Sequence, residues 1–332
     1  MRISKAVITA AGRGARQYLG SDSVQKAMLP LVDRDGMTKP VLQIIAEEAL
    51  ESGIERICVV CAPGDEEIYR GHFRDYAANL RSVSKETEWA SEQAKRLIDL
   101  DQRLQFLVQE EPLGYGHAVW TARPFVGDEP FLLLLEDHVY VSTERRRCAR
   151  QLIELAEAEN CAVSAVQATR EHLITQYGTL NGSRLSDRPD AYAIEQIIEK
   201  PNPTLAELKL QVPGLRAGHY LCFFGMHVLT PTVFELLDDL VRDDIREHGQ
   251  IQLSTALNAL SKRERYLAVE ARGTRYNLGV KFGGTEAQIA LALAGVDRER
   301  ILALLLETVA GFEMKVRAIP EGHVEVNTRY TP

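Results

Sequence analysis

The first half of the chain alternates short apolar runs with segments of helical periodicity. Runs at residues 6–10, 56–61 and 131–135 have the length of strands, and helical patterns fill the stretches between them. The run Phe131–Leu135 has no polar face, so a strand there needs cover on both sides, as in a parallel sheet. Strands that alternate with helices imply right-handed crossover units. The pattern predicts a three-layer α/β fold around a mixed, mostly parallel sheet.

Individual elements follow from local signals. Thr38-Lys39-Pro40 is expected to open a helix that ends at Gly53, because Thr can cap a helix and Pro fits its first turn. Charged residues 84–100 indicate an exposed helical insertion. After residue 160 we expect, in chain order, strands at 162–168, 191–198 and 220–228 with a hairpin tip at 184–190, helices at 231–241 and 252–262, two helices within 285–309 and a strand at 313–318.

Composition excludes some classes of function. The net charge of -8 argues against nucleic acid as the main partner, because backbone phosphates require a basic surface. No segment has the ~18 consecutive apolar residues of a membrane span. The N-terminus shows no signal-peptide pattern, so a cytoplasmic location is expected. Cys58 and Cys61 have CxxC spacing but would face opposite sides of a strand, which suits neither zinc nor a disulfide.

Two positions are expected at the binding site, because ligands of such sheets lie beyond the carboxyl ends of the strands. One is the loop that begins at Ala11, and the other is Glu136-Asp137. The loop contains Gly12 and Gly14, whose spacing allows tight turns and close approach of backbone N–H groups to phosphate. Gln17 replaces the third glycine of a dinucleotide fingerprint, and Gln25-Lys26-Ala27 lacks the flanks of a P-loop. A simple tight connector remains the alternative.

Four motifs follow one another along the chain: Ala11-Gly12-Arg13-Gly14-Ala15-Arg16, Lys26-Ala27-Met28-Leu29-Pro30-Leu31, Leu113-Gly114-Tyr115-Gly116-His117-Ala118 and Ile198-Glu199-Lys200-Pro201. With this combination the chain resembles the sugar-nucleotide pyrophosphorylases, a branch of the nucleotidyltransferases with a Rossmann-like, nucleoside-diphospho-sugar transferase fold. Within that family it is most similar to the bacterial UTP–glucose-1-phosphate uridylyltransferases. The similarity covers residues 5–293.

The resemblance implies residues that hold the nucleotide. The backbone of Ala11, Gly12 and Gly14, with Gln109 and Gly116, would bind the base. A glutamine amide both donates and accepts, which suits the edge of uracil. Arg16 and Lys26 would bind the triphosphate and stabilise the departing pyrophosphate.

The resemblance also implies a metal and a sugar site. Asp137 would hold Mg²⁺ at the α-phosphate, since a carboxylate is a hard oxygen ligand. Tyr177, Gly178 and Glu199 would line the sugar pocket, and Lys200 would pair with the phosphate of the sugar. His138 is left out, because neighbouring residues in a strand point apart.

Several departures from the family pattern concern the site. Asn277 stands where the family has an aspartate that commonly serves as a second metal ligand, and an amide oxygen brings no charge. Ala15 replaces a threonine near the phosphates. Four extra residues around 34–38 are expected to alter a wall of the site or a subunit contact. Gly218-His219-Tyr220 differs from the sugar-region sequence of the uridylyltransferases.

The expected activity is condensation of an NTP, UTP first, with a sugar 1-phosphate such as glucose 1-phosphate. Alternatives are a homologue that uses another NTP or an unusual sugar-like phosphate, and a non-catalytic nucleotide-binding regulator. Residues 1–295 are expected to form the catalytic domain, with a nucleotide-binding half at 1–160 and a sugar-binding half at 161–282. Residues 296–332 would form a C-terminal helix and tail. Partners would be small molecules, with a homo-oligomer left open.

Overall fold

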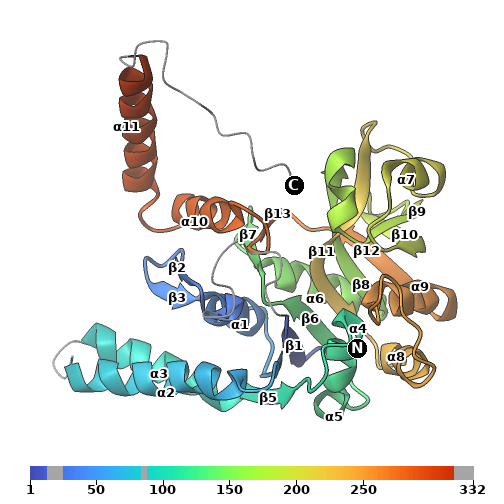
Figure 1. Cartoon of the computed structure of the whole chain (residues 1–332), viewed down its shortest axis with the longest axis horizontal. Coiled ribbons are helices and arrows are strands. Elements are labelled where there is room, and N and C mark those ends of the chain that lie inside the picture. Colours follow the sequence, from blue (N-terminus) through green and yellow to red (C-terminus); the bar gives the residue numbers. More distant parts are fainter. Residues whose placement is uncertain (13–24, 84–87, 318–332) are drawn as a thin grey trace.

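A central sheet organises the computed structural model, which describes residues 1–12, 25–83 and 88–317 (Figure 1). The described residues form a nine-stranded sheet in which β10 and β11 run against the other strands. The expected mixed, mostly parallel sheet is therefore confirmed. Its strands in spatial order are β5 (Leu104–Val108), β4 (Arg56–Cys61), β1 (Lys5–Ala10), β6 (Phe131–Leu135), β11 (His219–Leu229), β8 (Ala162–Arg170), β12 (Tyr266–Glu270), β10 (Ala191–Ile198) and β9 (Thr179–Arg184).

Helices cover both faces of this sheet, because its central strands are apolar on both sides. Along β6, Leu132 and Leu134 belong to one buried cluster, whereas Phe131 and Leu133 belong to another, and all four are fully buried. The three-layer prediction is thus confirmed. The first cluster includes α1 (Val41–Leu50), α2 (Asp65–Val83), α3 (Glu88–Arg103) and α6 (Cys148–Glu159), and the second includes α4 (Tyr115–Thr121), α5 (Arg123–Val126), α8 (Thr232–Arg242) and α9 (Leu253–Arg263).

Smaller elements surround the sheet. Among the described residues, short antiparallel ribbons join β2 (Pro30–Val32) to β3 (Thr38–Pro40) and β7 (His138–Ser142) to β13 (Gly273–Asn277). The same part of the chain contains the 3₁₀ turns η1 (Lys26–Met28) and η2 (Glu171–Gln176) and the helices α7 (Pro203–Lys209), α10 (Gly283–Leu293) and α11 (Arg298–Arg317). Helix α11 extends away from the sheet and exposes Leu304, Leu306 and Phe312 (Figure 1).

The expected start of the first helix is wrong. Thr38 does not cap α1, because Thr38–Pro40 is strand β3 and α1 begins only at Val41, with Pro40 as its N-cap. A residue before proline is disfavoured in helical conformation, so Lys39 stays extended. Its ammonium group is buried and pairs with Asp33 at 2.8 Å and Glu47 at 2.7 Å, which holds the hairpin against α1.

The helical insertion is only partly as expected. Helix α3 is one arm of an antiparallel pair with α2, and residues 84–87 lie outside the described part of the chain. The pair is not simply exposed, because Phe73 and Ala77 of α2 and Ala94 and Leu97 of α3 are buried. Apolar residues at helical spacing on both arms form this contact.

The tail departs from the prediction at its end. The two helices expected within residues 285–309 are present as α10 and α11. The strand expected at 313–318 is wrong, since residues 313–317 continue α11, and Ala318 lies outside the described residues. The other elements expected after residue 160 are found within a few residues of their predicted bounds.

The expected orientation of Cys58 and Cys61 is confirmed. Cys58 and Cys61 lie on opposite faces of β4, in different apolar clusters. These two and the other cysteines, all in the described part of the chain, are buried and free of disulfides. Among the described residues, no helix is both long and apolar enough to cross a bilayer.

A polar chain crosses three strands in the centre of the sheet. His227 of β11 stands opposite Ser164 of β8 in the strand register, and the Ser164 hydroxyl contacts both the His227 ring and the Tyr266 hydroxyl. Complete burial lowers the pKa of His227 to about 3. The neutral ring is therefore the form that the fold accommodates.

This burial predicts acid sensitivity. The folded pKa of His227 lies below the unfolded value, so its contribution to stability is complete above about pH 6.5 and is lost as the pH falls. Between pH 7 and pH 5 the loss should approach about 2 kcal/mol. Thermal unfolding at both pH values should show a smaller acid-induced drop in Tm for His227→Gln than for the wild type. The exposed control His172→Gln should match the wild type, and equal drops in all three proteins would contradict the account.

Candidate active site

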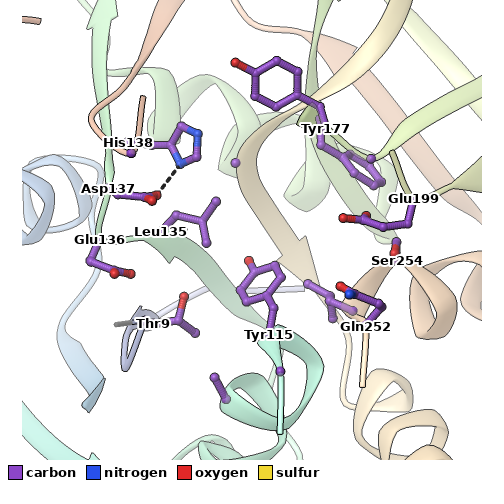
Figure 2. A pocket seen from close by; sticks show the side chains of 18 of the residues that line it. Thr9, Tyr115, Leu135, Glu136, Asp137, His138, Tyr177, Glu199, Gln252 and Ser254 are labelled. Carbon is purple, nitrogen blue, oxygen red and sulfur yellow. Dashed lines mark ion pairs between the residues drawn. The ribbon is translucent and has the colours of Figure 1, made fainter. Parts of the chain in front are cut away.

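A cavity of about 530 Å³ opens at the carboxyl ends of the central strands. Its lining includes Glu199 and Lys200, which follow the antiparallel strand β10, and residues at the carboxyl ends of parallel strands: Gln109 after β5, Ala11 and Gly12 after β1 and Asp137 after β6. This is the edge of the sheet at which ligands of open α/β sheets bind. Figure 2 shows Glu136 and Asp137 on one side of the cavity, facing Tyr177 and Glu199 on the other, with Tyr115 between them.

Parallel pairing of β1 with β6 builds the first wall. Thr9 is in register with Leu135, and the Glu136 N–H donates to the Thr9 carbonyl at 3.2 Å. The two chain turns that follow are therefore neighbours. A Cβ atom on Gly12 would lie 3.2 Å from Glu136 Oε1, so glycine leaves room for that carboxyl group.

Gln109 reaches the cavity directly after β5. Its backbone N–H donates to the Cys61 carbonyl at 2.9 Å, which continues the pairing of β5 with β4. Its side-chain Nε2 lies 3.2 Å from the Gly114 carbonyl and 2.9 Å from His117 Nδ1. The amide is 5% exposed and thus held by two partners at the cavity wall.

Asp137 is the centre of a small polar cluster. Lys26 Nζ lies 3.4 Å from Asp137 Oδ2, and His138 Nδ1 lies 3.0 Å from Asp137 Oδ1. Asn277 Oδ1 accepts from the Gly279 N–H at 2.8 Å. A Cβ atom on Gly279 would lie 2.9 Å from Asp137 Oδ2 and 3.0 Å from Asn277 Oδ1, so the two oxygens flank one point.

The pKa values of the two adjacent carboxyl groups shift in opposite directions. Burial opposes the charge of Asp137, but His138 and Lys26 outweigh it and hold the pKa of Asp137 well below its usual range. Burial, together with the charge of Asp137, raises the pKa of Glu136 well above its usual value. The surroundings therefore favour the carboxylate form of Asp137 and the neutral form of Glu136.

The opposite wall comes from the second half of the chain. Lys200 Nζ lies 3.1 Å from Glu199 Oε1, and the Lys200 N–H donates to the Tyr177 carbonyl at 3.2 Å. Gly178 is packed so closely that a Cβ atom there would lie 2.8 Å from the Phe223 ring and 3.1 Å from Glu199 Oε2. Glycine at 178 thus keeps the Glu199 carboxylate at the cavity surface.

The structure brings most of the sequence-predicted residues to this one cavity. Those that line it are Ala11, Gly12, Lys26, Gln109, Asp137, Tyr177, Gly178, Glu199, Lys200 and Asn277. Gly14, Ala15 and Arg16 lie outside the described residues.

Gly116 does not fit the role expected for it. It is not among the cavity-lining residues, and its N–H already donates to the Ile251 carbonyl at 2.8 Å. A Cβ atom there would lie 2.9 Å from the same carbonyl oxygen. The glycine serves close packing of α4 against the chain before α9.

Two of the departures from the family pattern lie away from the cavity. The extra residues near 34–38 form the β2–β3 turn, where the Arg34 carbonyl accepts from the Val296 N–H at 2.8 Å. They do not form a wall of the site. Tyr220 packs in a cluster with Ile174 and Leu210 rather than lining the cavity.

The cavity residues that were missed at the sequence level include His138, Arg275 and Ser254. His138 was excluded because neighbours in a strand point apart, but Asp137 precedes β7, and the turn lets both side chains meet. Arg275 lies 3.9 Å from the centre of the Tyr177 ring and donates to the Phe223 carbonyl. Arg275 and Asn277 are two residues apart in one strand and therefore point to the same face, so the sequence could have identified Arg275. No neighbouring residue in the sequence indicates that Ser254 lines the cavity.

Known proteins are similar to this chain in sequence. The profile of the family described as nucleotidyl transferase matches residues 5–276. The UTP–glucose-1-phosphate uridylyltransferase YngB of Bacillus subtilis (strain 168) is 34% identical, over 95% of this chain and 98% of that protein. The UTP–glucose-1-phosphate uridylyltransferase of Streptococcus pneumoniae serotype 4 is 33% identical, over 88% of this chain and 91% of that protein.

Solved structures agree with these relatives. A UDP-glucose pyrophosphorylase complexed with UDP-glucose has a TM-score of 0.68 and 27% identity, over 87% of this chain and 98% of that chain. A UTP-bound enzyme of the same kind from Acinetobacter baumannii has a TM-score of 0.73 and 25% identity, over 92% of this chain and 99% of that chain. The chain belongs to the nucleotidyl transferase family, so the resemblance inferred from its motifs is confirmed.

The cavity geometry predicts a specific sensitivity at Gly114. Its φ of +128° is unfavourable for other residues, and a Cβ atom would lie 2.7 Å from the Ile251 carbonyl oxygen. We expect Gly114→Ala to lower the free energy of unfolding by about 2–4 kcal/mol, from strain and overpacking together. Gly64→Ala is the matched control, because Gly64 has a φ of +86° but open space around it. Urea denaturation should show that Gly64→Ala lowers the free energy of unfolding by only about 1–2 kcal/mol. Equal losses in the two variants would contradict the role assigned to close packing at Gly114.

Proposed function

We propose that this protein transfers a uridylyl group from UTP to a sugar 1-phosphate, with glucose 1-phosphate as the first candidate, and releases pyrophosphate. One observation carries the proposal. Lys26 and Asp137 lie on one wall of a single cavity and Glu199 and Lys200 on the other, so two phosphate-bearing substrates can meet between them. The activities named for the relatives support the same reaction.

The nucleotide half of the cavity is assigned to the first half of the chain. The backbone of Ala11 and Gly12 offers a surface with little side-chain bulk, and Gln109 offers an amide to the base. Lys26 provides a cation for the triphosphate. The role proposed for Arg16 rests on the motif alone. Departing pyrophosphate carries charge that such cations stabilise.

A divalent cation, Mg²⁺ by proposal, would be held by Asp137 and Asn277. Oxygens of both side chains lie close to Gly279, and both are the hard ligands that Mg²⁺ prefers. When bound, the ion would neutralise charge on the phosphates and orient the α-phosphate. Of the two side chains only Asp137 contributes a negative charge, so we expect metal affinity to be lower than with two carboxylates.

The sugar half is assigned to the second half of the chain. Glu199 presents carboxylate oxygens that can accept from sugar hydroxyls, beside Tyr177 and Gly178. Lys200 would pair with the phosphate of the sugar and aim its oxygen. That oxygen attacks the α-phosphorus, a new P–O bond forms, and the bond to the β-phosphate breaks as pyrophosphate leaves.

The proposed division of labour also defines the domain. Residues 1–295 would be the catalytic unit, with the nucleotide at residues 1–160 and the sugar at 161–282. The positions of Asp137, Tyr177 and Glu199 support this division, because Asp137 lies on one side of the cavity and the other two lie on the opposite side. Residues 296–332 would lie outside the catalytic unit.

A substrate panel tests the proposal. The protein is incubated with Mg²⁺, each common NTP and a set of sugar 1-phosphates, and pyrophosphate release is measured. Release that is strongest with UTP and glucose 1-phosphate is expected. Release only with another pair would favour the same-fold alternative. No release with any pair, despite nucleotide binding, would sink the enzyme proposal and favour a regulatory binder.

Lys26 should be essential for rate. Its side chain is 12% exposed and sits beside the proposed metal ligand Asp137. We expect Lys26→Ala to lower kcat/KM by on the order of 10² or more, as removal of one charge contact to the transition state does. Steady-state kinetics with UTP provide the measurement, and the exposed control Lys209→Ala should keep the wild-type value. A variant at position 26 with unchanged kcat/KM would exclude the assigned role.

Asn277 should limit metal affinity. A carboxylate in its place would add a charge next to Asp137, so Asn277→Asp is expected to lower the Mg²⁺ concentration for half-maximal rate by at least about threefold. Calorimetric Mg²⁺ titration in the presence of UTP should show the same change. Asn202→Asp, which adds the same charge at the exposed N-cap of α7, serves as control. If both variants behave alike, position 277 is not a metal ligand.

A further inference from the structure

The orientation of the Gln109 amide is fixed by its neighbours. The Gly114 carbonyl can only accept a hydrogen bond, so the amide atom 3.2 Å from it must be Nε2. The φ of +128° at Gly114, together with the hydrogen bonds that Leu113 and Gly116 on either side of it make to Ile251, leaves that peptide little freedom. One hydrogen of the amide group is therefore committed to the protein backbone.

The second amide hydrogen is committed to His117. Its Nδ1 lies 2.9 Å from the same Nε2 atom, and an amide nitrogen donates but does not accept. Nδ1 must then be the unprotonated ring nitrogen, and the proton resides on Nε2. The Glu111 backbone is a hydrogen-bond partner of this ring, and burial lowers the pKa of His117, which keeps the ring neutral.

The ring itself is held by packing. His117 is 9% exposed and stacks on Trp120 with 5.4 Å between ring centres. Trp120 Nε1 in turn donates to Asp238 Oδ1 at 2.7 Å. His117 does not line the cavity, whereas Gln109 does. The imidazole can therefore act on a ligand only through the glutamine.

With both amide hydrogens used, the carbonyl oxygen Oε1 is the polar atom that Gln109 has left to offer a ligand. An acceptor at that point requires a donor on the base. Uracil carries N3–H at its pairing edge, whereas N3 of cytosine and N1 of adenine are acceptors. Binding of cytosine or adenine would place a ring acceptor against Gln109 Oε1. Both buried groups would then lack a hydrogen bond, which lowers the affinity for these bases.

We propose that His117 is a positioning residue that sets the base preference of the nucleotide site, by holding the Gln109 amide with its oxygen toward the base. The inference rests on the proposed nucleotide-binding function. It attributes the preference for uracil over cytosine to a series of hydrogen bonds that runs from Glu111 through the His117 imidazole to Gln109. Contact between His117 and the nucleotide is not required.

A pair of substitutions of similar size tests the inference. Oδ1 of asparagine can occupy the place of the imidazole Nδ1 and accept the same hydrogen bond, whereas leucine has a similar shape and no acceptor. Calorimetry on the full chain gives the Kd of UMP and of CMP, and their ratio is the readout. His117→Leu should lower the preference for UMP about five- to tenfold, the value of one hydrogen bond. His117→Asn should restore it to within about twofold of the wild type.

The ratio of the Kd values of UMP and CMP distinguishes a positioning role of His117 from a general loss of structure. A merely structural loss in His117→Leu would weaken UMP and CMP alike and leave their ratio unchanged, which would overturn the inference. The same follows if the wild type shows no preference for UMP. His172→Leu, the same substitution at an exposed histidine that does not line the cavity, should keep the wild-type ratio.

Failure of the proposed reaction remains distinguishable, because the binding ratio needs no turnover. A wild type that prefers UMP but releases no pyrophosphate would contradict the transferase proposal alone. A fall of the ratio in His117→Leu would still support the role of His117.

Discussion

The parallel pairing of β1 with β6 is the constraint on which the site depends. Two strands that run in the same direction end at the same edge, so the turn at Ala11–Gly12 and the turn at Glu136–Asp137 become neighbours although they are distant in sequence. The bond from the Glu136 N–H to the Thr9 carbonyl fixes that register beyond the last residues of the strands. Apolar side chains on both faces of β6 make the pairing stable, because they are buried under helices on each side.

Antiparallel β11 then attaches the second wall to the first. It pairs with β6 on one side and with β8 on the other, so the sheet passes without a break from the nucleotide half to the proposed sugar half. The Tyr140 hydroxyl donates to the Gly225 carbonyl at 2.8 Å, which ties β7 to the bend in β11. Charges are distributed unequally across the cavity: Asp137 is ionised beside Lys26, whereas neighbouring Glu136 is driven toward its neutral form by burial.

Sequence predicts the parts of this structure that follow from local pattern. The apolar run at 131–135 predicts a strand covered on both faces, and the motifs around Gly12, Lys26 and Lys200 indicate the family. Sequence fails where a distant contact overrides a local signal. Thr38 looks like a helix cap, but Lys39 is held in a hairpin by buried carboxylates. Asp137 and His138 meet because a turn, not a strand, joins them. The engagement of both Gln109 amide hydrogens depends on neighbours whose positions only the fold defines.

The central claim is that one cavity holds a uridine nucleotide and a sugar phosphate during exchange with pyrophosphate. The reverse reaction tests it most directly, because every ligand must then occupy the same site. The protein is mixed with UDP-glucose, radiolabelled pyrophosphate and Mg²⁺, and the label in UTP is followed over time. The account predicts that label enters UTP and that glucose 1-phosphate appears in equal amount. Absence of label from UTP, in protein that binds UDP-glucose, would contradict it.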